Sequence, residues 1–301
     1  MKCLVTGATG FIGSALIDKW IQSDLVDDIV AVSRTPEKIH HRFNGKVEAI
    51  SDFSQLADGH GIDAVVNLAG EPILDKRWSE DRKKILYDSR LQITTKLVEF
   101  LARSTDKPKV LISGSAIGYY GSQRDNRELT ENESWHPCFA HHLCHDWENK
   151  AMEAEAEGIR VCLLRTGVVL GNGGALARML PPFRLGLGGP VGHGRQWFSW
   201  IDLEDMVCGI DFLLHRETLT GPFNLTAPNP VSNKEFSQAL GEALKRPAVL
   251  PMPAVIMRML LGEGAELLVE GQRVVPEKLL QAGFEFHYPE LKQSLTHYLA
   301  D

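Results

Sequence analysis

Apolar, β-branched runs alternate with stretches of helical periodicity through the first half of the chain. A short apolar run bounded by turn residues predicts a strand, and a longer segment with apolar residues three and four positions apart predicts an amphipathic helix. The predicted strands cover Lys2–Thr6, Ile29–Ser33, Val47–Ile50, Ala64–Leu68, Val110–Ser113 and Arg160–Arg165, and the predicted helices cover Ser14–Ser23, Glu80–Arg103 and Ala140–Glu157. This alternation predicts an α/β fold whose parallel sheet is covered by helices on both faces.

The alternation ends near residue 165, and the rest of the chain is less regular. Residues 167–195 contain nine glycines and a Pro-Pro pair, which favours a cleft border or lid with a regular element only in its middle. Further elements are predicted as a helix over Asp202–His215, a strand over Pro222–Leu225, a helix over Asn233–Lys245 with Asn233 as its N-cap, and an amphipathic helix from about Pro289.

A glycine-rich turn, Thr-Gly-Ala-Thr-Gly-Phe-Ile-Gly over residues 6–13, follows the first predicted strand. Its glycines permit a tight turn, close approach of the backbone to a pyrophosphate and close packing of the next helix on the sheet. The free N–H groups at the start of that helix bind phosphate. The position between a strand and an amphipathic helix favours dinucleotide binding over glycines that serve packing alone. The residues predicted to contact the dinucleotide in this turn are Gly7, Thr9, Gly10, Phe11, Ile12 and Gly13.

These observations together predict a Rossmann-type, doubly wound parallel sheet joined to a smaller C-terminal α+β lobe. The chain has 301 residues, of which 44% are hydrophobic, and this is enough for two coupled lobes. The dinucleotide-binding domain is predicted over residues 1–165 and 202–226, and a substrate lobe over residues 166–201 and 227–301.

The end of the second predicted strand indicates which dinucleotide is bound. An acidic residue there normally accepts hydrogen bonds from the adenosine ribose, but this strand ends in Ser33 and Arg34. Ser33 donates to a phosphate, and Arg34 pairs with a phosphate and stacks on adenine, so we predict NADP(H) rather than NAD(H). A solvated arginine at the start of a loop is the alternative. The small residues at 67–70 (Asn-Leu-Ala-Gly) suit backbone contact with the cofactor, although packing alone also explains them.

Composition limits the partners and the compartment. The formal charge is −7 and the pI is near 5.9, with no Lys or Arg run longer than residues 82–84, so we expect neither a nucleic-acid surface nor a membrane surface. No apolar run reaches the length of a membrane span, and the five cysteines include no Cys-x-x-Cys pair, which predicts a cytoplasmic protein with reduced thiols. Cysteines and histidines gather at residues 138–145, but their spacing matches no zinc template, and no metal is expected.

Several strings of the sequence resemble a known enzyme class. The opening turn, residues 67–70 and the Ser-Gly-Ser at 113–115 look like the extended short-chain dehydrogenases/reductases, which include sugar-nucleotide epimerases. Further strings resemble an atypical branch, the NAD-dependent epimerase/dehydratase-like family of NADP-binding proteins that carry a C-terminal domain of their own. These strings lie at residues 70–71, 88–90, 115–121, 144–148, 165–171, 182–189, 270–276 and 282–286, so the resemblance covers nearly the whole chain.

The resemblance implies the same cofactor, NADP(H). It places the phosphates on the opening glycines and the 2′-phosphate on Ser33 and Arg34. The resemblance also implies that Arg90 and Arg165 contact the cofactor. For each of these arginines, a surface or interlobe salt bridge is the alternative. The other cofactor contacts that it implies or supports are Leu68, Ala69, Gly70, Arg90, Ser113 and Arg165.

The chain departs from the wider class at the pair that transfers a proton. Class members combine a Ser or Thr with Tyr-x-x-x-Lys, in which the lysine lowers the tyrosine pKa. Counting back from Glu148 puts Ala140 at the tyrosine position and Cys144 at the lysine position. Neither residue transfers a proton as that pair does. The remaining candidates for the reaction centre are Ser115, which matches the active-site serine, and Tyr119 or Tyr120.

The resulting hypothesis is an NADP(H)-dependent oxidoreductase, or an epimerase-like enzyme, that acts on a small polar molecule, nucleotide sugars included. The missing proton-transfer pair supports a rival, a non-catalytic NADP(H)-binding protein that senses the nicotinamide redox state. A buried tyrosine with a satisfied hydroxyl is the alternative role for each candidate tyrosine. The residues leave open the substrate, the reaction direction and the oligomeric state.

Overall fold

A seven-stranded sheet forms the centre of the computed structural model, which describes residues 1–23, 25–123 and 125–299. The strand order is β11-β7-β5-β4-β1-β2-β3, and all neighbours are parallel. These strands are β1 (Lys2–Thr6), β2 (Asp28–Val32), β3 (Glu48–Ile50), β4 (Ala64–Asn67), β5 (Val110–Ala116), β7 (Arg160–Thr166) and β11 (Gly221–Leu225). The order reverses between β1 and β4, where α/β sheets of this kind open a crevice at the carboxyl ends of the strands.

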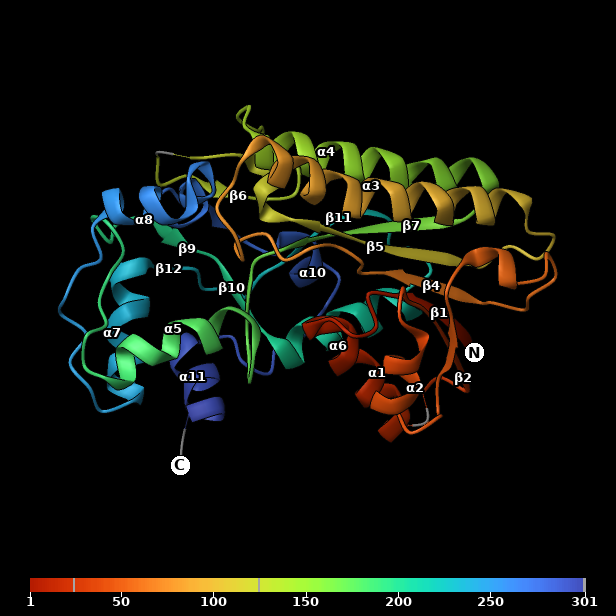
Figure 1. Ribbon diagram of the computed structural model, residues 1–301, viewed down its shortest axis with the longest axis horizontal. Helices are drawn as coiled ribbons and strands as arrows, with labels where there is room; N and C mark the ends of the chain where they lie inside the picture. Colours follow the sequence, from red (N-terminus) through yellow and green to blue (C-terminus); the bar gives the residue numbers. More distant parts are fainter. Residues whose placement is uncertain (24, 124, 300–301) are drawn as a thin grey trace.

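Helices cover both faces of the sheet (Figure 1). In β1 the side chains of Cys3 and Val5 enter one apolar core, and Leu4 enters the core on the opposite face. Strands buried on both faces are continuously apolar, which is the pattern in the sequence. The first core packs α1 (Phe11–Ser23), α2 (Pro36–Arg42) and α6 (Leu203–His215), and the second packs α3 (Glu80–Arg103) and α4 (Phe139–Met152). The predicted α/β fold with a doubly wound parallel sheet is confirmed.

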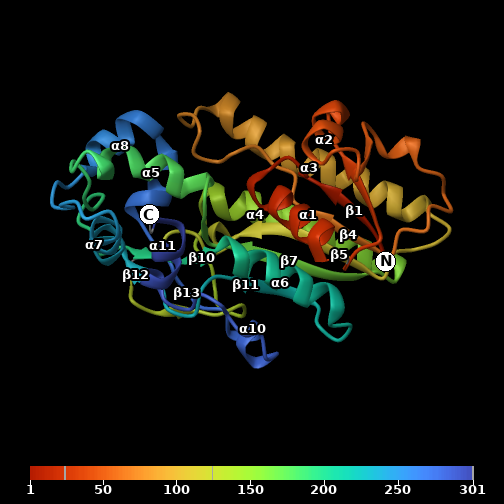
Figure 2. The same ribbon diagram turned by 90° about the horizontal axis from the view of Figure 1, so that it is seen from below.

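A smaller lobe lies beside the carboxyl edge of the sheet (Figure 2). Its core contains Phe198, Trp200 and Phe236, so these aromatic rings serve packing. Its elements are β8 (Val168–Leu170), α5 (Gly174–Arg184), β9 (Trp197–Phe198), β10 (Trp200–Asp202), β12 (Val231–Ser232), α7 (Asn233–Ala243) and α11 (Leu291–Leu299). Leu279 and Phe284 pack instead into the core under α1 and α6. The division into domains therefore stays a prediction.

The remaining elements of the described residues are short. They are the 3-10 helices η1 (Phe53–Gln55), η2 (Ile117–Tyr120), η3 (Glu153–Glu157) and η4 (Glu263–Ala265), the strands β6 (Glu128–Leu129) and β13 (Arg273–Val274), and the helices α8 (Ala254–Leu261), α9 (Glu266–Val269) and α10 (Glu277–Gln281). Strands β6 and β13 pair with each other, which ties the C-terminal segment to the loop after β5.

The structure corrects the predicted start of α7. Ser232, and not Asn233, is the N-cap, because its side chain accepts from the Glu235 N–H and Glu235 bonds back in a capping box. The side chain of Asn233 instead accepts a hydrogen bond from the Val191 N–H at 2.7 Å. Two candidate cap residues stand side by side in the sequence, and only the tertiary contact decides between them.

Candidate functional site

The glycine-rich loop between β1 and α1 is held by close backbone contacts. Gly7 has a φ of +73°, and a Cβ there would lie 2.6 Å from the carbonyl carbon of Leu68. A Cβ on Gly13 would clash with the carbonyl oxygen of Gly7, which accepts a hydrogen bond from the Gly10 N–H at 2.9 Å. Glycine is therefore required at the first and third positions. The turn leaves Thr9 and Gly10 exposed at the edge where β1 ends.

The ring of Phe11 lies against the glycine-rich segment that follows β8. A Cβ on Gly173 or Gly174 would lie 2.8 Å from ring atoms of Phe11, and one on Gly171 would lie 3.0 Å from the ring. The contact brings the smaller lobe onto the start of α1. The glycine cluster that predicts a cleft border therefore lies next to the proposed phosphate loop.

A buried hydrogen-bond network joins the ends of β1, β4 and β5. The Thr6 hydroxyl donates to Asn67 Oδ1 at 2.6 Å and accepts from the Ala69 N–H at 3.2 Å. Asn67 Nδ2 donates to Thr94 Oγ1 at 2.9 Å and to Ser113 Oγ at 3.2 Å. Ser113 is fully buried in this frame. The network fixes the edge on which the dinucleotide is predicted to lie, and contact between Ser113 and the cofactor stays a prediction.

The loop after β2 presents Ser33 and Arg34 at the same edge. The Arg34 side chain is 94% exposed, and its Nη2 lies 3.6 Å from Glu71 Oε1. Ser33 Oγ accepts from the Thr35 N–H at 3.1 Å and retains its own proton for donation. A guanidinium this exposed is available to an anionic ligand without losing a buried partner.

Arg90 braces the chain that follows β4. Its guanidinium packs on Gly70, where a Cβ would lie 3.1 Å from Cζ, and its Nη2 donates to the Glu71 carbonyl at 3.0 Å. The guanidinium also lies 5.3 Å from the ring centroid of Trp147. Burial lowers the pKa of Arg90. These contacts place Arg90 behind the loop 68–71 that borders the crevice.

A buried ion pair stands behind Ser115. The Ser115 hydroxyl donates to Glu148 Oε1 at 2.6 Å. Arg165 Nε and Nη2 donate to the two oxygens of Glu148, each at 2.9 Å, in a bidentate pair. Arg165 is only 3% exposed. Burial opposes its charge, but the hydrogen bonds and charge of Glu148 outweigh burial and raise the pKa of Arg165.

The two candidate tyrosines have different surroundings. Tyr120 is fully buried, and its hydroxyl donates to Asn224 Oδ1 at 2.7 Å and accepts from Arg165 Nη1 at 3.2 Å. Burial raises the pKa of Tyr120 to about 12. Tyr119 is only partly buried, and the Arg165 guanidinium lies 3.4 Å from the centroid of its ring. Tyr120 thus has the contacts of a structural residue, and Tyr119 is the more accessible phenol.

Helix α4 presents Ala140 and Cys144 to the segment that carries Ser115. A Cβ on Gly118 would lie 3.2 Å from the Ala140 side chain and 3.6 Å from the Cys144 sulfur. Burial raises the pKa of the Cys144 thiol to about 12, so the thiol stays protonated. Ala140 and Cys144, one helical turn apart, therefore lie next to the predicted reaction centre without supplying an acid or a base.

Three polar residues of this buried network, Glu131, Glu148 and Asn224, are not among the site residues predicted from the sequence. Glu131 is 4% exposed and accepts from the Asn224 N–H at 3.0 Å and from the Lys278 N–H. Burial raises the pKa of Glu131. In the sequence, Glu148 lies four residues after Cys144, on the apolar face of its helix. A carboxylate at such a position is the feature of the sequence that could have identified Glu148 as a site residue. Glu131 and Asn224 are 93 residues apart and have no comparable local pattern.

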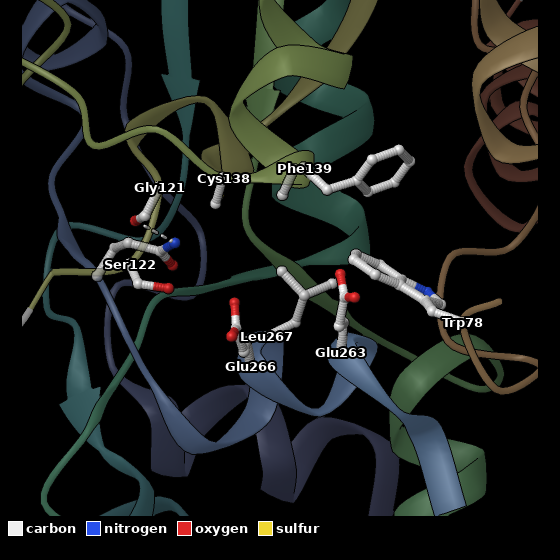
Figure 3. A pocket seen from close by; sticks show the side chains of 10 residues that line it. Trp78, Gly121, Ser122, Cys138, Phe139, Glu263, Glu266 and Leu267 are labelled. Carbon is white, nitrogen blue, oxygen red and sulfur yellow. Dashed lines mark hydrogen bonds between the residues drawn. The ribbon is translucent and has the colours of Figure 1, made fainter. Parts of the chain in front are cut away.

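A cavity opens where the loop after η2 meets the start of α4 and the η4–α9 segment (Figure 3). Ala140 lines its inner part, next to η2, and Trp78 closes one side. The outer part has a volume of about 540 Å³. Across this space Gln272 Nε2 donates to the Gly121 carbonyl at 2.8 Å. The cavity therefore lies between the sheet domain and the C-terminal segment, beside the predicted reaction centre.

Among the described residues, no helix has both the length and the apolar character needed to cross a membrane. In the same residues, no group of three or more His, Cys, Asp and Glu side chains has the geometry of a metal site. In the cluster at 138–145, His141 bonds the Tyr119 carbonyl at 2.6 Å and stacks on Trp135.

Comparison with protein families gives two matches that together cover most of the chain. The model of the NAD dependent epimerase/dehydratase family matches residues 3–225. A model described as Domain of unknown function (DUF1731) matches residues 252–298. The first match contains the glycine-rich loop, and the second contains the η4–α9 segment that lines the cavity.

Similar proteins occur in plants, bacteria and animals. The chain is 40% identical over 304 residues to the epimerase family protein SDR39U1 homolog, chloroplastic, of Arabidopsis thaliana, covering 98% of this chain and 86% of that protein. It is 41% identical over 296 residues to epimerase family protein ML0860 of Mycobacterium leprae, covering 97% and 94%.

Solved structures share the fold. The crystal structure of human epimerase family protein SDR39U1 (isoform 2) with NADPH has a TM-score of 0.89 at 34% identity, covering 100% of both chains. The UDP-glucuronic acid 4-epimerase of Bacillus cereus, in complex with UDP-glucuronic acid and NAD, has a TM-score of 0.78 at 18% identity, covering 100% of this chain and 99% of that one. At that identity the likeness concerns the fold alone.

Proposed function

This chain belongs to the NAD dependent epimerase/dehydratase family, and we propose that it binds NADP(H) and exchanges a hydride with a small polar substrate. The cofactor lies across the carboxyl edge of the sheet, with its pyrophosphate on the loop 7–13 and its 2′-phosphate on Ser33 and Arg34. The observation that carries the proposal is the exposed Arg34 guanidinium at the end of β2, in place of an acidic residue. The NADPH in the structure of human SDR39U1 supports the same assignment.

The residues at the crevice fit such a cofactor. Gly7 packs directly on the Leu68 carbonyl and Gly13 on the Gly7 carbonyl, so the absence of a Cβ at both positions permits the tight turn that presents backbone N–H groups to a pyrophosphate. Arg90 supports this loop, and Arg165 acts through its contact with Glu148 because it is almost fully buried. The bound cofactor supplies or accepts the hydride.

Ser115 and Tyr119 form the reaction centre of this proposal. Because the Ser115 proton is donated to Glu148, the lone pairs of its oxygen are free to accept a hydrogen bond from a substrate hydroxyl. Arg165 holds Glu148 in place through two hydrogen bonds. Tyr119 is the proton-transfer group because it is more accessible than Tyr120. The substrate enters through the cavity beside Ala140.

The cofactor assignment is tested by fluorescence titration with NADPH and NADH. NADPH is expected to bind at least about tenfold more tightly, since a phosphate-guanidinium pair is lost with NADH. Arg34→Ala is expected to bring the two affinities together, and Arg246→Ala, a change at another exposed arginine, to preserve the preference. Equal affinities in the unchanged protein would contradict the assignment.

A non-catalytic NADP(H) sensor is the second candidate function, and Ala140 and Cys144 favour it because they supply no proton-transfer pair. The two functions are separated by incubating the NADPH-bound protein with fractionated metabolites and following the loss of NADPH absorbance. Turnover that disappears in Ser115→Ala but persists in Ser54→Ala supports the enzyme. Absence of turnover, together with a partner captured only when NADPH is present, supports the sensor. A cytoplasmic location is part of either proposal.

A further inference from the structure

Glu71 lies where the loops that follow β4 and β2 meet at the carboxyl edge of the sheet. Strands β4 and β2 are the two neighbours of β1, so the loops at their ends flank the glycine-rich loop on either side. Glu71 Oε1 lies 3.6 Å from Nη2 of Arg34, the arginine that the proposed function assigns to the 2′-phosphate. A carboxylate therefore contacts the guanidinium group that is proposed to bind an anionic ligand.

Helix α3 fixes the backbone of Glu71 in this position. The Glu71 N–H donates to Ser89 Oγ at 3.1 Å, and its carbonyl accepts from Arg90 Nη2 at 3.0 Å. The side chain of Glu71 is 29% exposed, whereas that of Arg34 is 94% exposed. A long exposed side chain keeps most of its rotamer freedom. The carboxylate is therefore the fixed member of this pair, and the Arg34 guanidinium is the one that can turn toward a ligand.

A second arginine holds the other oxygen of the same carboxylate. Arg82 Nη1 donates to Glu71 Oε2 at 3.4 Å, and Arg82 Nη2 donates to the Pro72 carbonyl at 2.6 Å. The Arg82 side chain is 7% exposed, so it has little freedom to move. Glu71 therefore keeps a cationic partner when Arg34 turns to a ligand. The exchange of partners by Arg34 leaves no charge of this group without a counter-ion.

We propose that Glu71 is a specificity-determining residue, whose carboxylate competes with the 2′-phosphate of NADP(H) for Arg34 and so limits the preference for NADP(H) over NAD(H). A phosphate that binds Arg34 displaces the carboxylate from the guanidinium, and two anions that share one cation repel each other. NAD(H) carries a hydroxyl in place of the 2′-phosphate and does not meet this competition. The inference rests on the proposed function, because that function places the 2′-phosphate on Arg34.

The experiment is fluorescence titration of the unchanged protein and of Glu71→Gln with NADPH and with NADH. Glutamine keeps the size of the side chain and an acceptor oxygen for Arg82, so the fold is expected to be retained. NADPH is expected to bind about fourfold more tightly to Glu71→Gln, which is the effect of losing one exposed charge contact. NADH affinity is expected to stay within about twofold, so the preference for NADPH widens.

Salt and a matched variant separate this contact from a general effect of net charge. The gain in NADPH affinity is expected to shrink as the ionic strength rises from about 0.05 M to about 0.5 M, because exposed charges are screened. Asp28→Asn removes one negative charge at the exposed amino end of β2, the end of that strand opposite Arg34. This control is expected to change the affinity for neither cofactor.

Three results would count against Glu71 as a specificity-determining residue. Equal affinities for NADPH and NADH in the unchanged protein would contradict the proposed function, and the role of Glu71 with it. An NADPH preference that Glu71→Gln leaves unchanged would overturn the role of Glu71 alone. A loss of affinity for both cofactors in Glu71→Gln would also overturn it, because that result assigns Glu71 to holding the loop through Arg82.

Discussion

The two ends of the crevice are built in different ways. At the phosphate end, backbone atoms in adjacent loops make the site, and Gly7 and Gly13 matter because they lack a side chain. At the reaction end, the charged side chains of Glu148 and Arg165 come from a helix and a strand and meet in the interior. In the proposed function, cofactor binding therefore depends on local backbone shape, and the orientation of the reacting groups depends on buried charge.

The separation of the two ends explains how one chain can combine a cofactor loop with positions 140 and 144 that carry no proton-transfer pair. The loop 7–13 makes no hydrogen bond or ion pair with Glu148 or Arg165 among the described residues. Ala140 and Cys144 occupy the surface of α4 that faces Gly118. Their packing does not involve Gly7 or Gly13 of the cofactor loop. Changes at one end are thus expected to have little effect on the other.

The largest expected effect follows removal of the buried acid. Glu148→Ala leaves the Arg165 guanidinium buried without its partner, and the free energy of unfolding is expected to fall by about 4 kcal/mol. Chemical denaturation measures this change. Glu153→Ala, which removes the exposed partner of Lys150 on the following turn, is expected to cost less than about 0.5 kcal/mol.

NADPH titration of the Glu148→Ala variant tests whether the two ends of the crevice are independent. If the ends are independent, folded Glu148→Ala retains NADPH affinity within about threefold, or less than 1 kcal/mol. A loss of NADPH affinity as large as that caused by changes in the glycine loop would contradict the independence of the two ends.

The second expected effect is at the phosphate end. Gly7→Ala combines a left-handed backbone with a Cβ that would lie 2.6 Å from the Leu68 carbonyl carbon, and a loss of about 3 kcal/mol in stability is expected, together with loss of NADPH binding. Gly61 also has a positive φ, +64°, but no atom lies within 4 Å of its added Cβ. Gly61→Ala is therefore the matched control, with an expected cost of about 1 kcal/mol from the backbone alone and normal NADPH binding. Equal effects of the two changes would show that the close contact is unimportant.

The smallest expected effect is a pH dependence at the reaction end. Burial lowers the pKa of His141 from its usual 6.5, so the unfolded chain takes up a proton at this residue before the folded protein does. The stability that neutral His141 contributes is present above about pH 6.5 and is lost as the pH falls through its folded pKa. Denaturation curves at about pH 7.5 and about pH 5.5 measure the difference.

A variant assigns part of that pH dependence to this residue. His141→Gln removes the titrating ring and is expected to reduce the loss of stability between the two pH values. His41→Gln, at an exposed position in α2, is the control and is expected to leave the loss unchanged. An equal reduction in both variants would contradict the assignment to His141.

Local sequence predicted the elements of the first domain well because their signals lie within a few residues. Strand β1 and helix α3 have the predicted bounds, Lys2–Thr6 and Glu80–Arg103. Strand β5 continues three residues beyond its predicted end, to Ala116, because Ala116 pairs with Thr166 in a neighbouring strand that is distant in sequence. The predicted family and fold class were confirmed by the family match, the similar proteins and the seven-stranded sheet, while the roles of individual site residues stay predictions.

Local sequence was enough to predict the parallel α/β sheet, the glycine loop and the Ser33-Arg34 pair that follows β2. Each of these features depends on backbone preferences and residue spacing within a short segment of the sequence. Tertiary structure decided that Arg165 pairs with Glu148, that Tyr120 is buried on Asn224, and that acidic residues line the cavity. Burial and charge pairing depend on which distant segments come into contact, and local sequence patterns do not predict those contacts.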